Sequence, residues 1–257
     1  MPPDQPFDDW ADIYDAVYAY LDYDLSFYVH HATASGGPVL ELGCGTGRVS
    51  LAIAGAGIDV LGIDISPRMV EAARRKARSA RLDERAVFDV GDMADLRLDR
   101  TFGLAAMPFR SFHSMLTVED QRAALDNAAR HLAPGGLLVF DTFNPDIRTL
   151  TDSGDGIPFH VRDVEQPNGG NIVIWGQNSW DGVTQINSAR LIIEELDAGG
   201  VMQRRLYRDF DQRYTFRYEM EHLLELCGFH VEDIYGDFDG GDVTEDSDDL
   251  VWVARRV

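Results

Sequence analysis

Short apolar runs alternate with helical patterns over the first 145 residues of the chain. Each run is only a few residues long and mostly apolar, which is typical of a strand buried on both faces. Between the runs, apolar positions recur at a spacing of three and four, which predicts amphipathic helices. This alternation predicts an α/β fold with a doubly wound, mostly parallel sheet. The predicted strands lie at residues 38–42, 59–64, 86–90, 102–107 and 137–143.

The pattern changes between residues 151 and 215. Apolar and polar positions now alternate, and Asn168-Gly169-Gly170, Asp181-Gly182 and Gly199-Gly200 separate the segments, which favours antiparallel hairpins. Such strands do not extend a parallel sheet easily, so we expect them to fold over its edge or to form a dimer contact. The predicted strands lie at residues 159–164, 171–180, 185–196 and 201–211.

Three regions follow from these patterns. Residues 1–150 are predicted to form an N-terminal helical cover and a Rossmann-like core, and residues 151–215 an inserted antiparallel β lid. Residues 216–257 are predicted to complete the core sheet with a helix at 217–227, ended by Gly228, and two strands at 231–235 and 250–254.

The N-terminal segment, residues 7–30, carries apolar and aromatic residues at helical spacing and acids on the other side. The pattern predicts a helix with an apolar face. This helix either packs on the sheet or covers a ligand bound at the edge of the sheet.

A glycine-rich turn joins the first predicted strand to a helix. Gly43, Gly45 and Gly47 follow the strand directly, and the helical pattern begins beside them. Glycine accepts a positive φ and leaves room for a ligand, while a helix N-terminus offers N–H groups and a partial positive charge. A dinucleotide site would need a third glycine where this chain has Arg48.

An acid ends the second predicted strand. Asp64 lies at the carboxyl end of this strand, where a carboxylate can accept hydrogen bonds from both ribose hydroxyls of a nucleoside. This position alone does not show which nucleoside-containing cofactor would bind. Ser66 is predicted to cap the next helix, with Pro67 in its first turn.

The sequence Glu-Leu-Gly-Cys-Gly-Thr-Gly at 41–47 resembles the first motif of the class I S-adenosylmethionine-dependent methyltransferases. Gly91-Asp92-Met93 and the stretch from Arg130 to Gly136 resemble two further motifs of that family. The resemblance implies a seven-stranded sheet whose last strand is antiparallel, with S-adenosylmethionine as cofactor. It assigns cofactor binding to Tyr14, Glu41, Gly43, Cys44, Gly45, Asp64, Ile65, Ser66, Met69, Gly91, Asp92, Met93 and Pro108.

The turn after the fourth predicted strand is similar to the Pro-Phe-x-Ser-Phe turn of small-molecule methyltransferases, some of which, the sugar N-methyltransferases included, carry a histidine there. On this resemblance His113 is a candidate to accept or orient a substrate proton, and histidine is the side chain whose ordinary pKa suits that task. The alternative is a structural histidine. Candidate substrate-binding residues are Tyr18, Phe109, Arg110, Asn144 and Arg213. The Asp-Asn pair of metal-dependent catechol methyltransferases has no counterpart here, so we expect no metal.

Charge narrows the choice of partner. The 257 residues carry a formal net charge of −21, which disfavours nucleic acid and anionic lipid. The acidity reflects either a well-solvated surface or adaptation to high salt. No run approaches the roughly 20 apolar residues of a membrane span, and Cys44 and Cys227 are too few for a disulfide scaffold, so we expect a cytoplasmic protein.

The sequence therefore predicts a methyltransferase that moves a methyl group to a nitrogen or oxygen atom of a small polar metabolite, as a monomer or a homodimer. Two alternatives stay open. One is a non-catalytic protein that binds S-adenosylmethionine, and the other is an NAD-dependent oxidoreductase, which Arg48 and the Gly91-Asp92-Met93 step disfavour.

Overall fold

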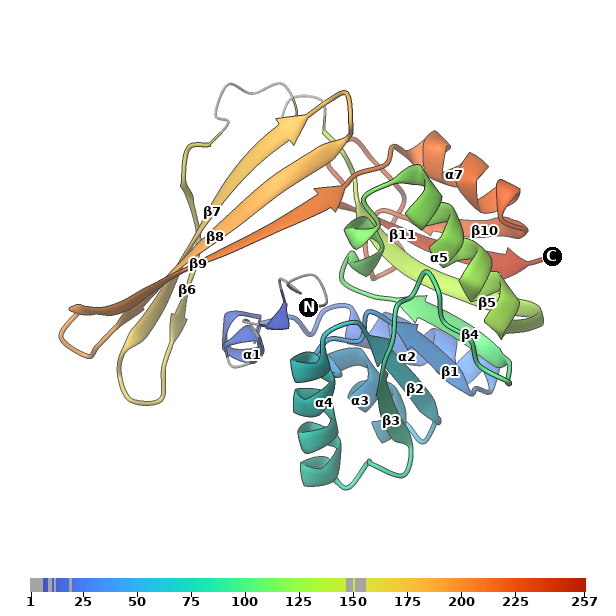
Figure 1. Ribbon diagram of the computed structural model, residues 1–257, viewed down its shortest axis with the longest axis horizontal. Helices are drawn as coiled ribbons and strands as arrows, with labels where there is room; N and C mark the ends of the chain where they lie inside the picture. Colours follow the sequence, from blue (N-terminus) through green and yellow to red (C-terminus); the bar gives the residue numbers. More distant parts are fainter. Residues whose placement is uncertain (1–6, 9–10, 12, 19, 147–149, 151–155) are drawn as a thin grey trace.

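The chain forms two separate β-sheets, seen side by side in the computed structural model (Figure 1). A seven-stranded sheet with helices on both faces makes the core, and a four-stranded sheet extends away from it. The structure describes all residues except 1–6, 9, 10, 12, 19, 147–149 and 151–155.

The core sheet has the strand order β10-β11-β5-β4-β1-β2-β3. The pairs β1–β2, β2–β3, β1–β4 and β4–β5 are parallel, and β11 is antiparallel to both of its neighbours, β5 and β10. The chain builds outward from β1 in both directions, so the order reverses between β1 and β4. The strands are β1 (Val39–Leu42), β2 (Val60–Asp64), β3 (Ala86–Val90), β4 (Phe102–Met107), β5 (Leu132–Phe143), β10 (Phe229–Tyr235) and β11 (Asp249–Arg256).

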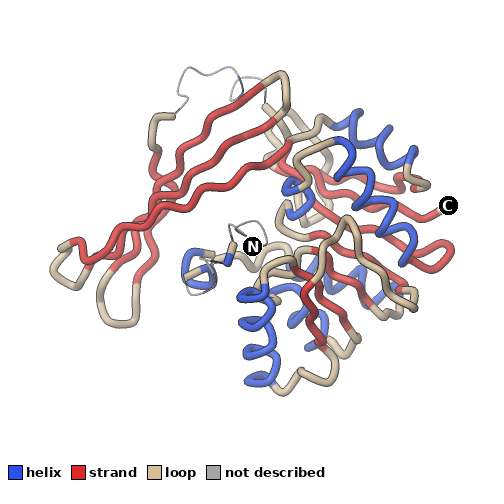
Figure 2. The backbone as a smooth tube through the Cα atoms, viewed as in Figure 1, coloured by secondary structure: helices blue, strands red, loops and turns tan. Residues whose placement is uncertain are grey.

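Helices cover both faces of this sheet, as Figure 2 shows. One hydrophobic cluster joins β-strand residues such as Leu40 and Trp252 to α5 and α7, and another joins residues such as Val39 and Val253 to α2 and α3. Successive strand residues therefore serve opposite faces, as the pleat requires. The helices are α2 (Leu25–Ser35), α3 (Arg48–Gly55), α4 (Pro67–Ala80), α5 (Val118–His131) and α7 (Arg217–Leu226).

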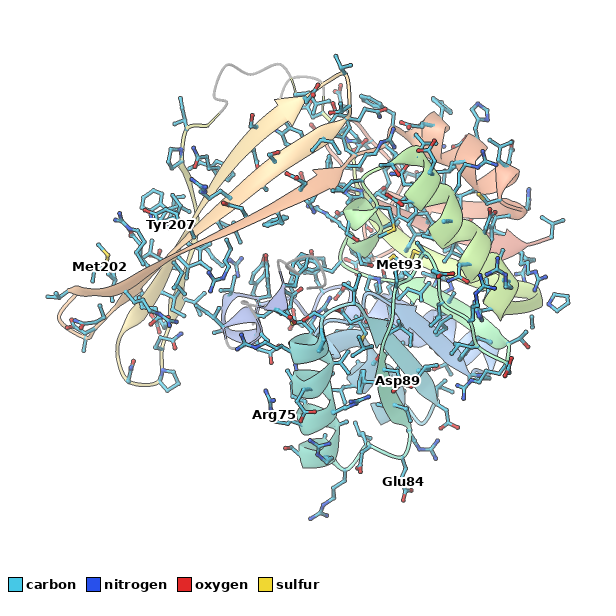
Figure 3. The ribbon with its side chains drawn as sticks, in the orientation of Figure 1. Arg75, Glu84, Asp89, Met93, Met202 and Tyr207 are labelled. Atoms are coloured by element: carbon cyan, nitrogen blue, oxygen red, sulfur yellow. The ribbon has the colours of Figure 1, made fainter. Side chains whose placement is uncertain are left out.

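The second sheet is an antiparallel meander in the order β6-β7-β8-β9. Its inner face carries Ile172, Ile174 and Ile193, which pack on Val17 of the short helix α1 (Tyr14–Val17) and on Ile13, which precedes this helix. Figure 3 shows Met202 and Tyr207 projecting from this sheet away from the core. Its strands are β6 (Phe159–Glu165), β7 (Asn171–Asp181), β8 (Ile186–Leu196) and β9 (Met202–Arg213).

This architecture confirms the predicted fold class, including the antiparallel last strand. Ser66 caps α4 as predicted, because its hydroxyl accepts the N–H of Met69 at 3.1 Å. One boundary was wrong: α5 ends at His131 and β5 already begins at Leu132, where the sequence predicted a helix to Ala133 and a strand from Leu137.

The N-terminal segment is not the single helix that its spacing predicted. The described part contains α1 and α2, and the residues between Tyr20 and Asp24 are not helical. Asp24 is 2% exposed and forms an ion pair with Arg48, which also donates to the carbonyl of Leu21 at 3.1 Å. These contacts stabilise the non-helical segment between α1 and α2. The single predicted helix would place Asp24 on its solvent-facing side, whereas in the structure this acid is buried against Arg48. Trp10, a member of the predicted pattern, lies outside the described residues.

Within the described residues, none of the helices combines the length and the apolar character that crossing a membrane requires.

Close packing beneath the glycine turn gives a test of the core. A Cβ added at Gly62 of β2 would lie 2.6 Å from the Phe88 ring, which is itself buried, and 3.0 Å from Cys44 Cβ. We expect Gly62→Ala to lower the free energy of unfolding by about 1–3 kcal/mol in urea titrations, because a filled core has no room for the methyl group.

The matched control is Gly55→Ala at the end of α3, where an added Cβ meets nothing within 4 Å. This variant should be unchanged or more stable, by up to about 1 kcal/mol. A Gly62→Ala protein as stable as Gly55→Ala would contradict the packing described for β2.

Candidate functional site

The carboxyl ends of β1 and β4 lie side by side where the strand order reverses. In open α/β sheets this is the place where ligands bind, since the loops from the two strands diverge to opposite faces and leave a crevice. Most of the predicted cofactor residues follow β1, β2 or β3. Phe109, Arg110 and His113, which were predicted to bind the substrate or to handle its proton, follow β4. The topology therefore brings the two sets to one edge of the core.

The glycine turn follows β1 with three residues at positive φ. Gly43, Gly45 and Gly47 have φ values of +75°, +53° and +82°. A Cβ at Gly43 or Gly47 would lie within 3.0 Å of another side chain, whereas a Cβ at Gly45 would meet open space. The backbone is thus packed at two of the glycines and accessible to a ligand at the third.

Asp64 joins this turn to the end of β2. Its Oδ2 accepts the N–H of Gly45 at 2.7 Å and its Oδ1 accepts the N–H of Ser66 at 2.9 Å. Burial raises the pKa of the carboxyl, and the two backbone hydrogen bonds lower it. The carboxylate therefore lies beside the accessible backbone of Gly45, where a ligand bound on the glycine turn would come close to it.

Beyond Asp64, two apolar side chains are exposed at the ends of neighbouring strands. Ile65 is 43% exposed and Val90 is 49% exposed. Asp92 follows them as an exposed carboxylate whose Oδ1 accepts the N–H of Ala94 at 2.8 Å, while Gly91 N–H donates to the carbonyl of Asp64. Apolar contacts flanked by a carboxylate suit an aromatic ring with an exocyclic amino group.

The side chains of Glu41, Cys44, Met69 and Met93 are buried, unlike those of Ile65 and Asp92. Glu41 accepts a hydrogen bond from the Ser50 hydroxyl of α3, and burial raises its pKa to about 7. The Cys44 side chain packs in the cluster that joins α3 to α4. Figure 3 places Met93 inside the core. These side chains pack in the core beneath the loops that form the site.

The N-terminal segment is fastened across the glycine turn by acidic residues. Asp8 accepts the Ser66 hydroxyl, and Asp15 accepts the hydroxyl of Thr46 at 2.6 Å and the ammonium of Lys76 at 2.9 Å. Further along, the Asp24 carboxylate pairs with the Arg48 guanidinium, with Nη2–Oδ2 at 2.7 Å. The sequence assigned none of these contacts, because each joins residues far apart in the chain.

Aromatic rings connect this segment to the turn after β4. The rings of Tyr14 and Tyr18 lie 4.7 Å apart, and that of Tyr18 meets the Phe109 ring edge-on at 5.1 Å. Burial raises the pKa of both tyrosines, so each keeps its hydroxyl proton at neutral pH. Three predicted site residues thus line one path from the glycine turn to the β4 turn.

His113 lies in a 3₁₀ turn, Ser111–Ser114, and is fully buried. Its ring meets that of Phe143 at 4.6 Å, and within the described part of the chain neither ring nitrogen has a hydrogen-bond partner. Burial, aided by the charge of Arg110, lowers the pKa of His113 to about 3. Because buried polar groups are normally satisfied, two unpartnered nitrogens in one buried ring are unusual in a folded protein.

Two acids near Arg110 belong to the site, Asp141 of β5 and Asp249 of β11. Asp249 accepts two hydrogen bonds from the Arg110 guanidinium, the longer at 3.0 Å. Asp141, on β5, accepts the backbone N–H groups of Phe109 and Arg110. The only sequence signal was position, since Asp141 is near the carboxyl end of a core strand and Asp249 closes an acidic loop.

Two of the predicted substrate residues, Arg213 and Asn144, have hydrogen-bond partners within the protein. Arg213 is 6% exposed and donates to the side-chain oxygens of Gln121 and Gln185, and it pairs with Glu219, so it ties the second sheet to the core. The amide nitrogen of Asn144 donates to the carbonyl of Ser247 at 3.0 Å. Pro108 is buried at the start of the turn.

Among the described residues, no group of three or more histidine, cysteine or acidic side chains is arranged to hold a metal ion.

Comparison with known proteins gives a consistent result. Residues 39–136 match the family model described as a methyltransferase domain. The chain is 37% identical over 115 residues to the cypemycin N-terminal methyltransferase of a Streptomyces species, covering 45% of each protein. It is 32% identical over 140 residues to a dTDP-3-amino-3,4,6-trideoxy-α-D-glucopyranose N,N-dimethyltransferase of Streptomyces venezuelae, covering 52% of this chain and 56% of that protein. The matches thus span about half the length of these relatives.

A solved structure matches over nearly the full length. The CcbJ methyltransferase from Streptomyces caelestis superposes with a TM-score of 0.83 at 25% identity, covering 98% of each chain. The similarity therefore includes the second sheet as well as the core.

The buried histidine gives a test through pH. A histidine whose pKa is lower in the folded state stabilises the fold above its unfolded pKa of about 6.5, and this contribution is lost as the pH falls toward about 3. Relative to His113→Phe, the wild-type protein should lose about 1.4 kcal/mol of unfolding free energy per pH unit below pH 6.5.

The measurement is urea unfolding between pH 7.5 and pH 4.5. His222→Gln is the control, since the His222 side chain is 77% exposed, and it should follow the wild-type pH dependence. Parallel curves for the wild type and His113→Phe would show that this ring is hydrated or charged in the folded protein.

Proposed function

We propose that the chain, whose residues 39–136 match a methyltransferase-domain model, is an S-adenosylmethionine-dependent methyltransferase that transfers a methyl group to a nitrogen atom of a small polar metabolite. The observation that carries this proposal is the juxtaposition, at the reversal of strand order, of a cofactor half and a methyl-acceptor half. The glycine turn with Asp64 forms the first half, and the β4 turn with His113 forms the second.

The residues of the first half fit the cofactor. The open backbone at Gly45 and the helix N-terminus beyond it suit the amino-acid end of the molecule. Asp64 is placed for the ribose hydroxyls, and Ile65, Val90 and Asp92 for the adenine ring and its amino group. The tyrosine rings of the N-terminal segment suit the sulfonium, because an aromatic face attracts a cation.

S-adenosylmethionine supplies an electrophilic methyl group on a sulfonium. Displacement at this methyl needs an in-line nucleophile, so the chain contributes mainly by positioning. The aromatic path from Tyr14 to Phe109 and the Arg110–Asp249 pair are the groups that would orient the metabolite beside the cofactor half. The fastened N-terminal segment covers the cofactor half and limits the access of water.

A base is needed only where the methyl acceptor begins protonated. An amine is mostly an ammonium ion at neutral pH and must lose a proton before it attacks. His113 is neutral in the folded protein, but a ring whose pKa is about 3 is a weak base at neutral pH. We therefore assign His113 to orient the substrate amine when the substrate reaches it, through ring nitrogens that have no described partner, and the amine loses its proton to solvent.

The choice of nitrogen over oxygen rests on the aminosugar relative, since its name describes N,N-dimethylation. A small metabolite is favoured over nucleic acid because the net charge of −21 repels a phosphate backbone.

A homodimer would be formed most simply through the exposed outer face of the second sheet, where Tyr207 is 50% exposed.

Calorimetric titration with S-adenosylhomocysteine tests the cofactor half directly. Replacing Asp64 by Asn removes the charge that strengthens its hydrogen bonds, and bonds to charged groups contribute about 1.5–3 kcal/mol. We expect the dissociation constant of Asp64→Asn to rise about tenfold to one hundredfold.

Asp59→Asn is the matched control, because Asp59 precedes the same strand at its opposite end and pairs with Arg85 at 3.0 Å. Its affinity should equal that of the wild type. Equal affinities for Asp64→Asn and Asp59→Asn would reject the role of Asp64 in binding the ribose.

A further inference from the structure

The turn after β4 has an unusual backbone. Phe109 and Arg110 are consecutive non-glycine residues in the left-handed region, with φ values of +54° and +60°. Each such residue costs roughly 1–2 kcal/mol relative to ordinary conformations. A turn of this kind persists only where surrounding contacts hold it.

Asp141 supplies these contacts from the adjacent strand β5. Its Oδ1 accepts the N–H of Phe109 at 2.7 Å, and its Oδ2 accepts the N–H of Arg110 at 2.9 Å. The Tyr28 hydroxyl of α2 also donates to Oδ1, at 2.7 Å. Successive N–H groups in this conformation form a concave anion site, and here the anion is a side chain that is only 2% exposed.

The methyl-acceptor half of the site depends on this turn. The Phe109 ring meets Tyr18, and the Arg110 guanidinium reaches Asp249. The carbonyl of Arg110 accepts the N–H of His113 at 2.9 Å, so the 3₁₀ turn that carries the histidine begins from the same residue.

We propose that Asp141 is a positioning residue for methyl transfer, whose carboxylate fixes the backbone of Phe109 and Arg110 and through it the places of His113 and the Arg110 guanidinium. The inference rests on the proposed function for its consequence in catalysis. Asp141 itself reaches the reacting groups only through this backbone.

The charge of Asp141 matters to this arrangement. Burial raises its pKa to about 7, the Tyr28 hydrogen bond and Arg110 lower it, and Asp249 and Asp24 raise it. A protonated carboxyl would direct its own O–H toward one of the N–H groups that it now binds. Asparagine imitates this neutral form, because its NH₂ group can only donate.

The test compares Asp141→Asn with Asp249→Asn by amide hydrogen exchange. Both changes neutralise an acid that contacts residue 110, but only Asp141 binds the backbone. In Asp141→Asn, exchange of the Phe109 or Arg110 amide should accelerate at least tenfold relative to the wild type, while amides in β10 remain unchanged. In Asp249→Asn, both amides should stay protected.

The side-chain consequence is read from the ring signals of His113 in ¹H–¹⁵N spectra, assigned by His113→Phe. These signals should shift in Asp141→Asn. Unchanged amide exchange and unchanged His113 signals in a folded Asp141→Asn protein would overturn the proposal. If that variant fails to fold, the wild type decides: the Phe109 and Arg110 amides should be protected from exchange at pH 7, as amides paired in β10 are. Exchange of both amides at the unprotected rate would overturn the proposal.

Calorimetry separates this inference from the proposed function. Asp141→Asn should bind S-adenosylhomocysteine within threefold of the wild type, because the glycine turn and Asp64 are unaltered. If the wild type itself does not bind, the proposed function fails, whereas the amide exchange result still decides whether Asp141 holds the turn.

Discussion

The cofactor half of the site depends on the hydrogen bonds that the carboxylate of Asp64 accepts from the backbone. A turn with three glycines at positive φ does not hold its own shape, since glycine has the widest choice of backbone conformations. Asp64 binds the N–H groups of Gly45 and Ser66 at once, so it joins the turn after β1 to the start of α4. The carboxylate thereby connects the ends of β1 and β2 to the starts of α3 and α4. A ligand can approach this place from the open side of Gly45.

The other half of the site is built in the same way. Asp141 binds the backbone of the β4 turn, as Asp64 binds that of the β1 turn, and in each case the acid comes from an adjacent strand. The N-terminal segment adds a third set of acids, Asp8, Asp15 and Asp24, which hold it over the glycine turn. Part of the large acidic excess of the chain therefore has a local use, because carboxylates are the side chains that satisfy exposed N–H groups and arginines.

Local patterns predicted most of the fold. The apolar runs placed the core strands, Asn-Gly-Gly and similar turns placed the second sheet, and Ser66 with Pro67 placed the start of α4. Long-range contacts decided what the patterns missed. The spacing of residues 7–30 cannot reveal that Asp24 must meet Arg48, and Asp141 looks in sequence like any acid at a strand end. The partners of Arg213, a predicted substrate residue, come from α5, the turn before β8 and α7, and spacing along the sequence does not reveal them.

The most direct test of the central claim, that the glycine turn and Asp64 bind the adenosyl cofactor, is calorimetric titration of the wild-type protein with S-adenosylhomocysteine and, separately, with NAD⁺. The account predicts saturable binding of one S-adenosylhomocysteine per chain and no binding heat with NAD⁺, since Arg48 stands where a dinucleotide site has its third glycine. Binding of NAD⁺ in preference, or no binding of S-adenosylhomocysteine at millimolar concentration, would contradict it.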